Sequence, residues 1–302
     1  MSLKRKILLK FEKSPDLMNK KLLKWVQISV SVICIFLFLR QINFEQFISI
    51  LISTRLQLLL LSTIFFIISQ YISSIRLLGV FHYYKFNIHP QANHRLYLVG
   101  MFYNFFVPGG VGGDAYKIIH LNRIYSWSWK ALAKSLLIDR AIGLGALLCL
   151  LLLLIPTNIF SLHFSCKLII FFLSIAFGYF LTQFIFKAGP IYLKTLMWSF
   201  GVQVFQMLSV VCLVKSLGIS PEMTWSLLFV FLLTVIASLI SFAGIGVREY
   251  LFLWSSNWLD ISAELAAAVG VCFSLISAVV SFFGLYYVIF ENKLKLNDYN
   301  TS

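Results

Sequence analysis

Charged side chains are scarce in this 302-residue sequence. Asp, Glu, Lys and Arg make up 12% of it, whereas 60% of the residues are hydrophobic and the mean hydropathy is +0.89. A soluble domain usually carries about a quarter charged residues, so this deficit argues against a soluble protein. The apolar runs are also apolar on all sides, with no alternation of apolar and polar residues, which argues against a transmembrane β-barrel.

Acidic residues are the scarcer charge: 11 Asp and Glu stand against 25 Lys and Arg, for a formal net charge of +14. Such an excess in a soluble protein would suggest nucleic acid, but here many basic residues lie before the first apolar run. Lys and Arg collect on the cytoplasmic side of membrane proteins. We therefore predict a cytoplasmic amino terminus, attracted to anionic lipid headgroups, and no nucleic-acid partner. The eight basic residues are Lys4, Arg5, Lys6, Lys10, Lys13, Lys20, Lys21 and Lys24.

Several kinds of reactive site are missing from the sequence. The five cysteines are scattered and include no CxxC pair, so we expect them to be small core residues. His82, His89 and His94 lack the tight spacing of metal ligands, and we predict no metal or other cofactor. No nucleophile with a nearby base, no paired carboxylates and no ATP-binding motif stand out. We assign no catalytic residue, and any transport would be passive or coupled to an ion gradient.

What the sequence does contain is a series of long apolar runs. A helix needs roughly 20 apolar residues to cross a bilayer. The first run, Leu22 to Leu39, is followed by no Ala-x-Ala cleavage site, so we interpret it as a retained helix. The other predicted spans are Leu56 to Ile75, Ala131 to Ile155, Phe164 to Phe186, Pro190 to Lys215, Met223 to Ala243 and Ser262 to Phe290.

These runs predict an all-α, polytopic membrane helix bundle of about seven or eight spans with two broken or re-entrant segments. A shorter amphipathic stretch, Phe44 to Ile52, is expected to lie on the membrane interface. We divide the chain into a basic cytoplasmic segment (1–21), a single integral membrane domain (22–290) and a short cytoplasmic tail (291–302).

The first broken segment is the stretch "FFVPGGVGGDAYK" at residues 105–117. The apolar run before it, Leu96 to Val107, is too short to cross the bilayer. Pro108 and the four glycines should end that helix, and Asp114 is placed to cap a new helix over Ala115 to Asn122. Broken backbone at membrane depth must be buried in protein or line a wet cavity, so the stretch is a candidate binding region.

A second break follows in "SFAGIGVREY" at residues 241–250, where Gly244 and Gly246 match Gly110 and Gly112, each pair separated by the same length of chain. Paired breaks of this kind indicate an internally repeated transporter with a central site. Two independent glycine-rich turns are the alternative interpretation. Arg248, beside a new helix start, suits a phosphate group. Glu249, like Asp114, would either hold a headgroup or cap its helix.

Two adjacent charges, Asp139 and Arg140, lie in the apolar stretch "KSLLIDRAIGLGALLCLLLLLIP". A charge at the bilayer centre costs about 2.5 to 3.5 kcal/mol on insertion scales. We interpret the two residues either as a neutralised pair or as part of a site. In the last span, Gly270, Ser274 and Ala278 recur every four residues, which indicates close helix packing more than a site.

At "NFFVPGGVGGDAYK", "IDRAIGL" and "FAGIGVREYLF" the chain resembles the lysylphosphatidylglycerol synthase transmembrane-region family, also called flippase-like membrane proteins. Lys117 stands where members often carry arginine, and Arg76 also looks like a family position. Bifunctional synthases of the family carry a cytosolic aminoacyl-transfer domain after the membrane part. Only twelve residues follow Phe290 here, so the resemblance implies no aminoacyltransferase activity. The matching positions are Asn104, Pro108, Gly110, Gly113, Asp114, Asp139, Arg140, Gly244, Gly246, Arg248 and Glu249.

The resemblance implies a protein of the bacterial cytoplasmic (inner) membrane that binds a membrane lipid or lipid-linked glycan and moves its headgroup between leaflets. Two alternatives stay open: a membrane transferase acting on a lipid-linked substrate, and an accessory subunit partnering a lipid-modifying enzyme such as a glycosyltransferase or lipid synthase. The predicted substrate-binding residues are Asn104, Gly110, Gly113, Asp114, Lys117, Asp139, Arg140, Gly244, Gly246, Arg248 and Glu249.

Overall fold

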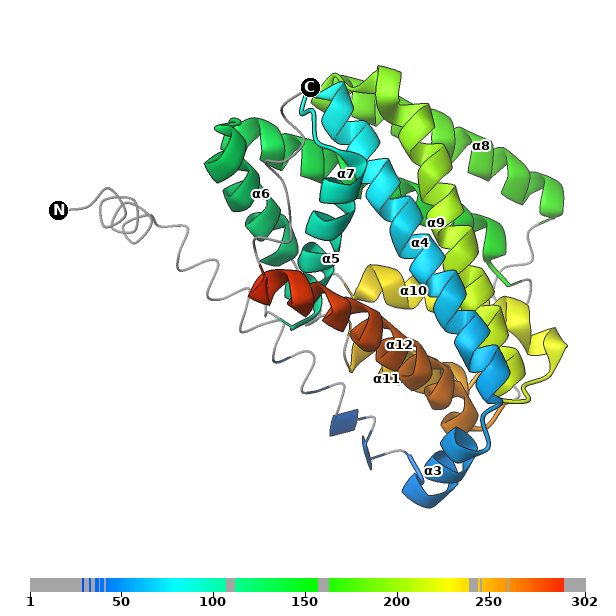
Figure 1. Cartoon of the computed structure of the whole chain (residues 1–302). Helices are drawn as coiled ribbons and strands as arrows, with labels where there is room; N and C mark the ends of the chain where they lie inside the picture. The colour runs from blue at the N-terminus through cyan, green and yellow to red at the C-terminus, as the bar shows by residue number, and fades with distance from the viewer. Residues whose placement is uncertain are drawn as a thin grey trace.

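The computed structural model describes residues 42–106, 112–156, 163–238, 244, 246–259 and 261–290, with a few isolated positions between 29 and 40. Within these residues every regular element is a helix (Figure 1). Five helical segments are long and apolar enough to cross a membrane, which confirms the predicted helix bundle. They are α4 (Leu56–Tyr83), α7 (Trp129–Leu154), α8 (Phe164–Leu181) with its π-helical end η1 (Thr182–Phe186), α9 (Gly189–Ser216) and α12 (Ala263–Ile289).

Parts of the predicted organisation lie outside the described residues. These are the basic segment 1–21, the tail 291–302 and most of the predicted span from Leu22 to Leu39. The count of seven or eight spans therefore stays a prediction. The amphipathic stretch forms the helix α3 (Phe44–Ile52), where the Asn43 side chain accepts hydrogen bonds from the amides of Glu45 and Gln46 at 3.1 and 3.4 Å. Its place on the membrane interface stays a prediction.

Four shorter helices flank the two glycine stretches: α5 (Pro90–Phe106), α6 (Gly112–Tyr125), α10 (Thr224–Ala237) and α11 (Val247–Ser255). Several predicted boundaries were wrong: α4 continues to Tyr83 and does not end at Ile75, and α6 is longer at both ends than Ala115 to Asn122. α5 begins at Pro90, six residues before Leu96, because proline suits the first position of a helix whatever the polarity of the turn that follows. α10 ends at Ala237 and not at Ala243, since hydropathy alone continues the apolar run past the helix end. α10 follows the 3₁₀ turn η2 (Pro221–Met223).

The helices fall into two series with the same order of lengths: long, short, short, long. The first series is α4, α5, α6 and α7, and the second is α9, α10, α11 and α12. The spacing between corresponding helices agrees to within one residue along the chain. α5 begins at residue 90 and α10 at 224, while α7 begins at 129 and α12 at 263. Both pairs of starts are 134 residues apart, a distance along the chain that we name the repeat interval. Gly110 and Gly244 are separated by the same interval.

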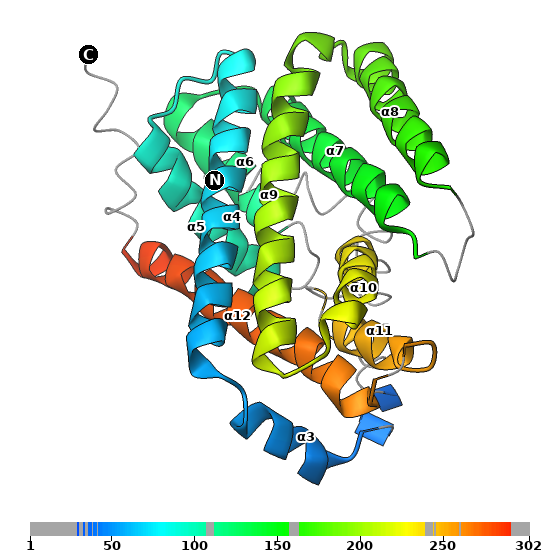
Figure 2. The same ribbon diagram turned by 90° about the vertical axis from the view of Figure 1, so that its right-hand side faces the viewer.

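The two series run in opposite directions. Figures 1 and 2 show α4 and α9 packed side by side, with α4 rising from the bottom of the view to the top and α9 descending. The Oγ atoms of Ser62 and Ser209 form a hydrogen bond of 2.8 Å between these helices. Small polar residues of this kind join helices within a bilayer, where the hydrophobic effect does not.

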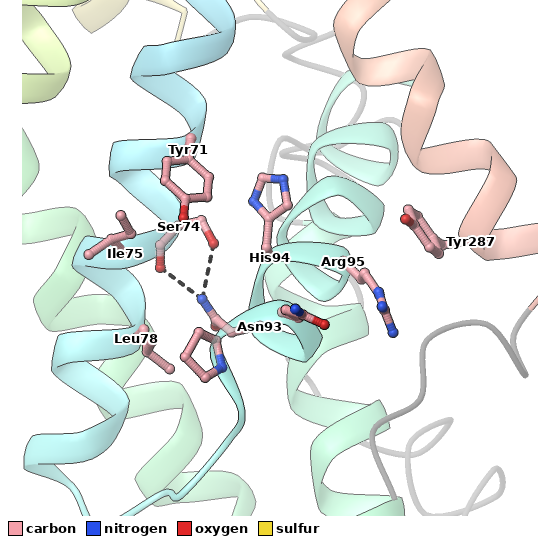
Figure 3. Close-up of a pocket in the computed structure, with 10 residues that line it drawn as sticks. Tyr71, Ser74, Ile75, Leu78, Asn93, His94, Arg95 and Tyr287 are labelled. Atoms are coloured by element: carbon pink, nitrogen blue, oxygen red, sulfur yellow. Dashed lines mark hydrogen bonds between the residues drawn. The ribbon is translucent and has the colours of Figure 1, made fainter. Parts of the chain in front are cut away.

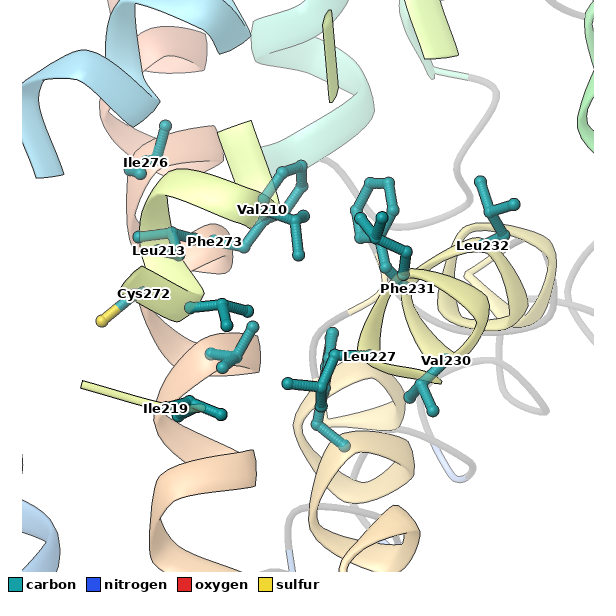
Figure 4. Packing of buried hydrophobic residues seen from close by; sticks show 14 of the residues in the cluster. Val210, Leu213, Ile219, Leu227, Val230, Phe231, Leu232, Cys272, Phe273 and Ile276 are labelled. Carbon is teal, nitrogen blue, oxygen red and sulfur yellow. The ribbon is translucent and has the colours of Figure 1, made fainter. Parts of the chain in front are cut away.

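The largest apolar core joins the second series to α4. Phe231 on α10 and Phe273 on α12 pack edge to face with ring centroids 4.8 Å apart, surrounded by aliphatic side chains of α9 and α10 (Figure 4). α12 is the most buried of the five long helical segments, and α8 is the least. The second broken segment is therefore attached to the centre of the bundle, whereas α8 lies at its edge (Figure 2).

Candidate functional site

Five charged side chains from three helices line one cavity of about 200 Å³. We name it the charged cavity. Residues of α5 complete its wall beside these charges. The charged residues are Arg76 on α4, Asp114 and Lys117 on α6, and Asp139 and Arg140 on α7; the other lining residues are Tyr97, Met101, Asn104 and Leu136.

At one side of the charged cavity Arg76 and Asp139 form a two-pronged ion pair. The Nε and Nη2 atoms of Arg76 each donate to a carboxylate oxygen of Asp139 at 2.8 Å, and Nη1 donates to Ser199 Oγ at 3.0 Å. Both side chains are nearly buried, with 11% and 9% of their surface exposed. A Cβ atom on Gly143 would lie 2.9 Å from Nη1, so this glycine makes room for the guanidinium.

At the other side Asp114 holds two cations. Its carboxylate accepts a hydrogen bond from Arg140 Nε, and its other oxygen lies 3.5 Å from Lys117 Nζ. Lys117 is buried and lies 4.8 Å from the centre of the Tyr97 ring. The charged cavity thus contains three cations and two carboxylates, a formal excess of one positive charge.

Asp139 and Arg140 do not neutralise each other, which corrects one interpretation of the sequence. Asp139 pairs with Arg76, and Arg140 pairs with Asp114. The physical reason is helix geometry: adjacent residues point in different directions around the axis, and only residues three or four apart face each other. That the two residues belong to a binding site stays a prediction.

The hairpin of α5 and α6 depends on glycine. A Cβ atom on Gly113 would overlap the carbonyl oxygen of Gly100, so no other residue fits between these helices. The amide of Gly113 donates to Asn104 Oδ1 at 2.8 Å. Asp114 is the third residue of α6 and not its N-cap, as the sequence had suggested. The amino-terminal end of α6 uses Asn104 as an acceptor, which leaves the Asp114 carboxylate to Arg140 and Lys117.

The second break carries a separate polar cluster on α11 and α12. Arg248 Nη1 donates to Ser274 Oγ at 3.0 Å, and the Ser274 hydroxyl donates to Glu249 Oε1 at 2.5 Å. The other Glu249 oxygen accepts from the amide of Gly246 at 2.7 Å, so Glu249 both caps α11 and joins the cluster. Gly244 and Gly246 have φ angles of +80° and +83°, which favour glycine. Ser274 therefore does more than allow close packing.

Arg248 is buried with 8% exposure and lies 5.1 Å from the centre of the Phe273 ring. Its Nε is buried without a hydrogen-bond partner among the described residues. Phe273 belongs to the large apolar core, against which Met101 of the charged cavity also packs. That core is therefore in contact with residues of both polar groups. Arg248 and Glu249 do not line the charged cavity.

The contacts of the two series correspond at the repeat interval. In the first series Asp114 on the second short helix contacts Arg140 on the following long helix, 26 residues later. In the second series Arg248 contacts Ser274, also 26 residues later. Asp114 and Arg248 are separated by the repeat interval, and so are Arg140 and Ser274. The two broken segments therefore hold polar side chains in equivalent places, although the residue types differ.

The predicted residues thus fall into two groups. The first is Asn104, Gly113, Asp114, Lys117, Asp139 and Arg140, and the second is Gly244, Gly246, Arg248 and Glu249. Gly110 lies outside the described residues. The substrate-binding residues predicted from the sequence do not include Arg76 or Tyr97, both of which line the charged cavity. Arg76 directly follows the predicted span from Leu56 to Ile75, and the structure places it inside α4, where an unpaired charge is costly. Within the described part of the chain, no group of three His, Cys, Asp or Glu side chains could hold a metal ion.

Comparison of the sequence with known proteins identifies its family. The family model described as "Lysylphosphatidylglycerol synthase TM region" matches residues 24–189, more than half of the chain. The chain belongs to this family. The match confirms the resemblance seen in the sequence, and it supports an integral membrane protein with a lipid-related function. No curated protein and no solved structure matches the chain.

The stretch matched to the lysylphosphatidylglycerol synthase transmembrane region ends at the start of α9. It contains all the charged residues of the charged cavity and none of the second polar cluster. The likeness of "FAGIGVREYLF" to the family therefore stays a prediction, whereas its structural correspondence with the first break rests on the helix order and spacing described above.

Proposed function

We propose that this protein binds the headgroup of a lipid or lipid-linked molecule in the charged cavity and moves it between the two leaflets of the bilayer. The observation that carries the proposal is the charge of the cavity: Arg76, Lys117 and Arg140 outnumber Asp114 and Asp139 by one. An excess cation inside a membrane protein is costly, and an anionic group such as a phosphate would neutralise it. The proposed ligand is therefore an anionic headgroup.

Arg140 is the side chain best placed to receive that group. It is 40% exposed, whereas Asp114 and Lys117 are 13% and 5% exposed. Its ion pair uses Nε, and among the described residues its Nη1 and Nη2 have no hydrogen-bond partner. A guanidinium offers planar donors that match phosphate oxygens. We propose that the ligand phosphate contacts Arg140 first and is then shared with Lys117.

The two antiparallel series support movement of the ligand in addition to binding. Inverted repeats with broken helices are typical of transporters in which one half rocks against the other around a central site. In this scheme the first break supplies the charged cavity, and the second break, whose Arg248 and Glu249 lie outside that cavity, belongs to the half that moves against it. We also propose, from the basic amino-terminal segment, that the amino terminus is cytoplasmic in a bacterial inner membrane.

Purified protein in liposomes tests this function directly. A fluorescent anionic phospholipid is placed in both leaflets, and the loss of fluorescence after adding a membrane-impermeant quencher reports exchange between them. We expect the protein to accelerate exchange over empty liposomes, and Arg140→Gln to slow it at least about tenfold, the effect of losing a hydrogen bond to a charged group. Lys130→Gln is the matched control, because Lys130 is exposed on the same helix.

Unchanged exchange in both Arg140→Gln and Asp114→Asn would refute the proposed site. Lipids from the same liposomes are then analysed by mass spectrometry. A chemically altered lipid would favour the transferase, since a transporter leaves its substrate intact. Co-purification with a lipid-modifying enzyme, without exchange by the protein alone, would favour the accessory subunit.

A further inference from the structure

The repeat interval relates residues that line the charged cavity to residues of the second helix series. Counting forward by this interval from three of the lining residues reaches three apolar side chains. The pairs are Arg76 with Val210, Tyr97 with Phe231, and Asp139 with Phe273. We name Val210, Phe231 and Phe273 the apolar triad. The place that holds two charged groups and a tyrosine in the first series thus holds only apolar groups in the second.

The apolar triad is buried and closely packed. Its members are 0%, 0% and 3% exposed, and all three belong to the largest apolar core (Figure 4). The rings of Phe231 and Phe273 pack edge to face with centroids 4.8 Å apart. Their counterparts Tyr97 and Asp139 both line the space of about 200 Å³ that forms the charged cavity. Corresponding places in the two series are therefore in different states, one open and one closed.

The charged cavity and the apolar triad lie toward opposite ends of the bundle. Arg76 lies near the carboxyl end of α4 and Val210 near the carboxyl end of α9, and these two helices run in opposite directions (Figure 2). Met101 lines the charged cavity and also packs against the largest apolar core. The charged cavity therefore adjoins this core, whose apolar triad lies toward the other side of the membrane.

We infer that the apolar triad is a gate, closed in this structure, through which the headgroup leaves the charged cavity toward the opposite side of the membrane. Transporters built from inverted repeats give access to one side at a time, by gating one repeat against the other around a fixed site. One half with an open cavity and one half with a packed core correspond to such a state. The inference rests on the proposed function, and it names the side chains that separate when the headgroup crosses.

Arg248 lies against the gate and favours its opening. The guanidinium is 5.1 Å from the centre of the Phe273 ring, and its Nε is buried without a hydrogen-bond partner among the described residues. A buried donor without a partner is costly. Separation of Phe273 from Phe231 would admit water to this donor, which offsets part of the cost of exposing the two rings.

Thiol labelling of the full chain in liposomes tests the gate without relying on transport. The five native cysteines are first replaced by serine. Val210→Cys then places one thiol in the apolar triad, and Val80→Cys places one at an equally buried position of α4 outside it. Mass spectrometry follows modification by a water-soluble thiol reagent. We expect Val210→Cys to react at least about tenfold faster, because opening a gate requires less free energy than unfolding the protein.

A second substitution in Val210→Cys tests the ring pair. Phe231→Leu should speed labelling about twofold to tenfold, the effect of losing an aromatic pair. Phe81→Leu, which removes an equally buried ring of another aromatic pair, is the control and should leave the rate unchanged. Equal labelling of Val210→Cys and Val80→Cys, or equal effects of the two Phe→Leu changes, would overturn the gate even if lipid exchange continues. Labelling as expected without any exchange would instead refute the proposed function.

Discussion

Replacing the ion pair between Arg76 and Asp139 by apolar residues should be far less damaging than removing either partner. The two side chains are nearly buried and share two hydrogen bonds of 2.8 Å. Arg76→Met leaves the buried Asp139 carboxylate without its paired cation, and Asp139→Leu leaves a buried guanidinium with only Ser199 as acceptor. The double variant leaves neither charge.

Removing one partner of a buried pair costs about 3 to 5 kcal/mol, whereas replacing both by apolar residues is neutral or stabilising by about 1 to 4 kcal/mol. We therefore expect each single variant to lower the free energy of unfolding by about 4 kcal/mol. The double variant should come within about 1 kcal/mol of the natural protein or exceed it. The two single costs would then fail to add by at least about 7 kcal/mol.

Reversible unfolding in mixed detergent micelles, followed by circular dichroism, measures these differences. The four proteins are the natural chain, the two single variants and the double variant, and each must refold to the same helical content. If the double variant loses the sum of the two single losses, the pair does not act as a unit. The assigned geometry of Arg76 would then be wrong.

Three further predictions concern packing and hydrogen bonding at the two breaks. Gly143→Ala should destabilise the protein by about 1 to 3 kcal/mol by crowding the Arg76 guanidinium. Gly145→Ala, with nothing within 4 Å, should be neutral or stabilising by up to about 1 kcal/mol; equal melting temperatures for the two variants would contradict this. Gly113→Ala should abolish the folded protein in size-exclusion chromatography, because its Cβ would overlap a backbone carbonyl of α5. Ser274→Ala should cost about 1 to 3 kcal/mol of unfolding free energy by leaving two charged groups of the second cluster without their shared partner; a loss below about 0.5 kcal/mol would contradict that role.

Some features could be read from the sequence because they depend on local properties. Five long apolar runs became long helices, since the bilayer fixes the length of apolar chain needed to cross it. The second break has the backbone that its glycines indicated, with positive φ at Gly244 and Gly246. Ordered motifs were enough to identify the family.

The sequence alone therefore determined a helical membrane protein of this family, with two broken segments and charges inside its spans. Only the tertiary structure decided which charges meet. Asp139 pairs with Arg76, 63 residues away, and Arg140 with Asp114, 26 residues away, whereas the adjacent residues in the chain do not pair. Partner choice depends on how helices rotate and pack, and composition does not encode that rotation. The hydrogen bond of Asn93 on α5 to the Ser74 carbonyl on α4, beside a cavity that the end of α12 also lines (Figure 3), likewise follows from helix packing.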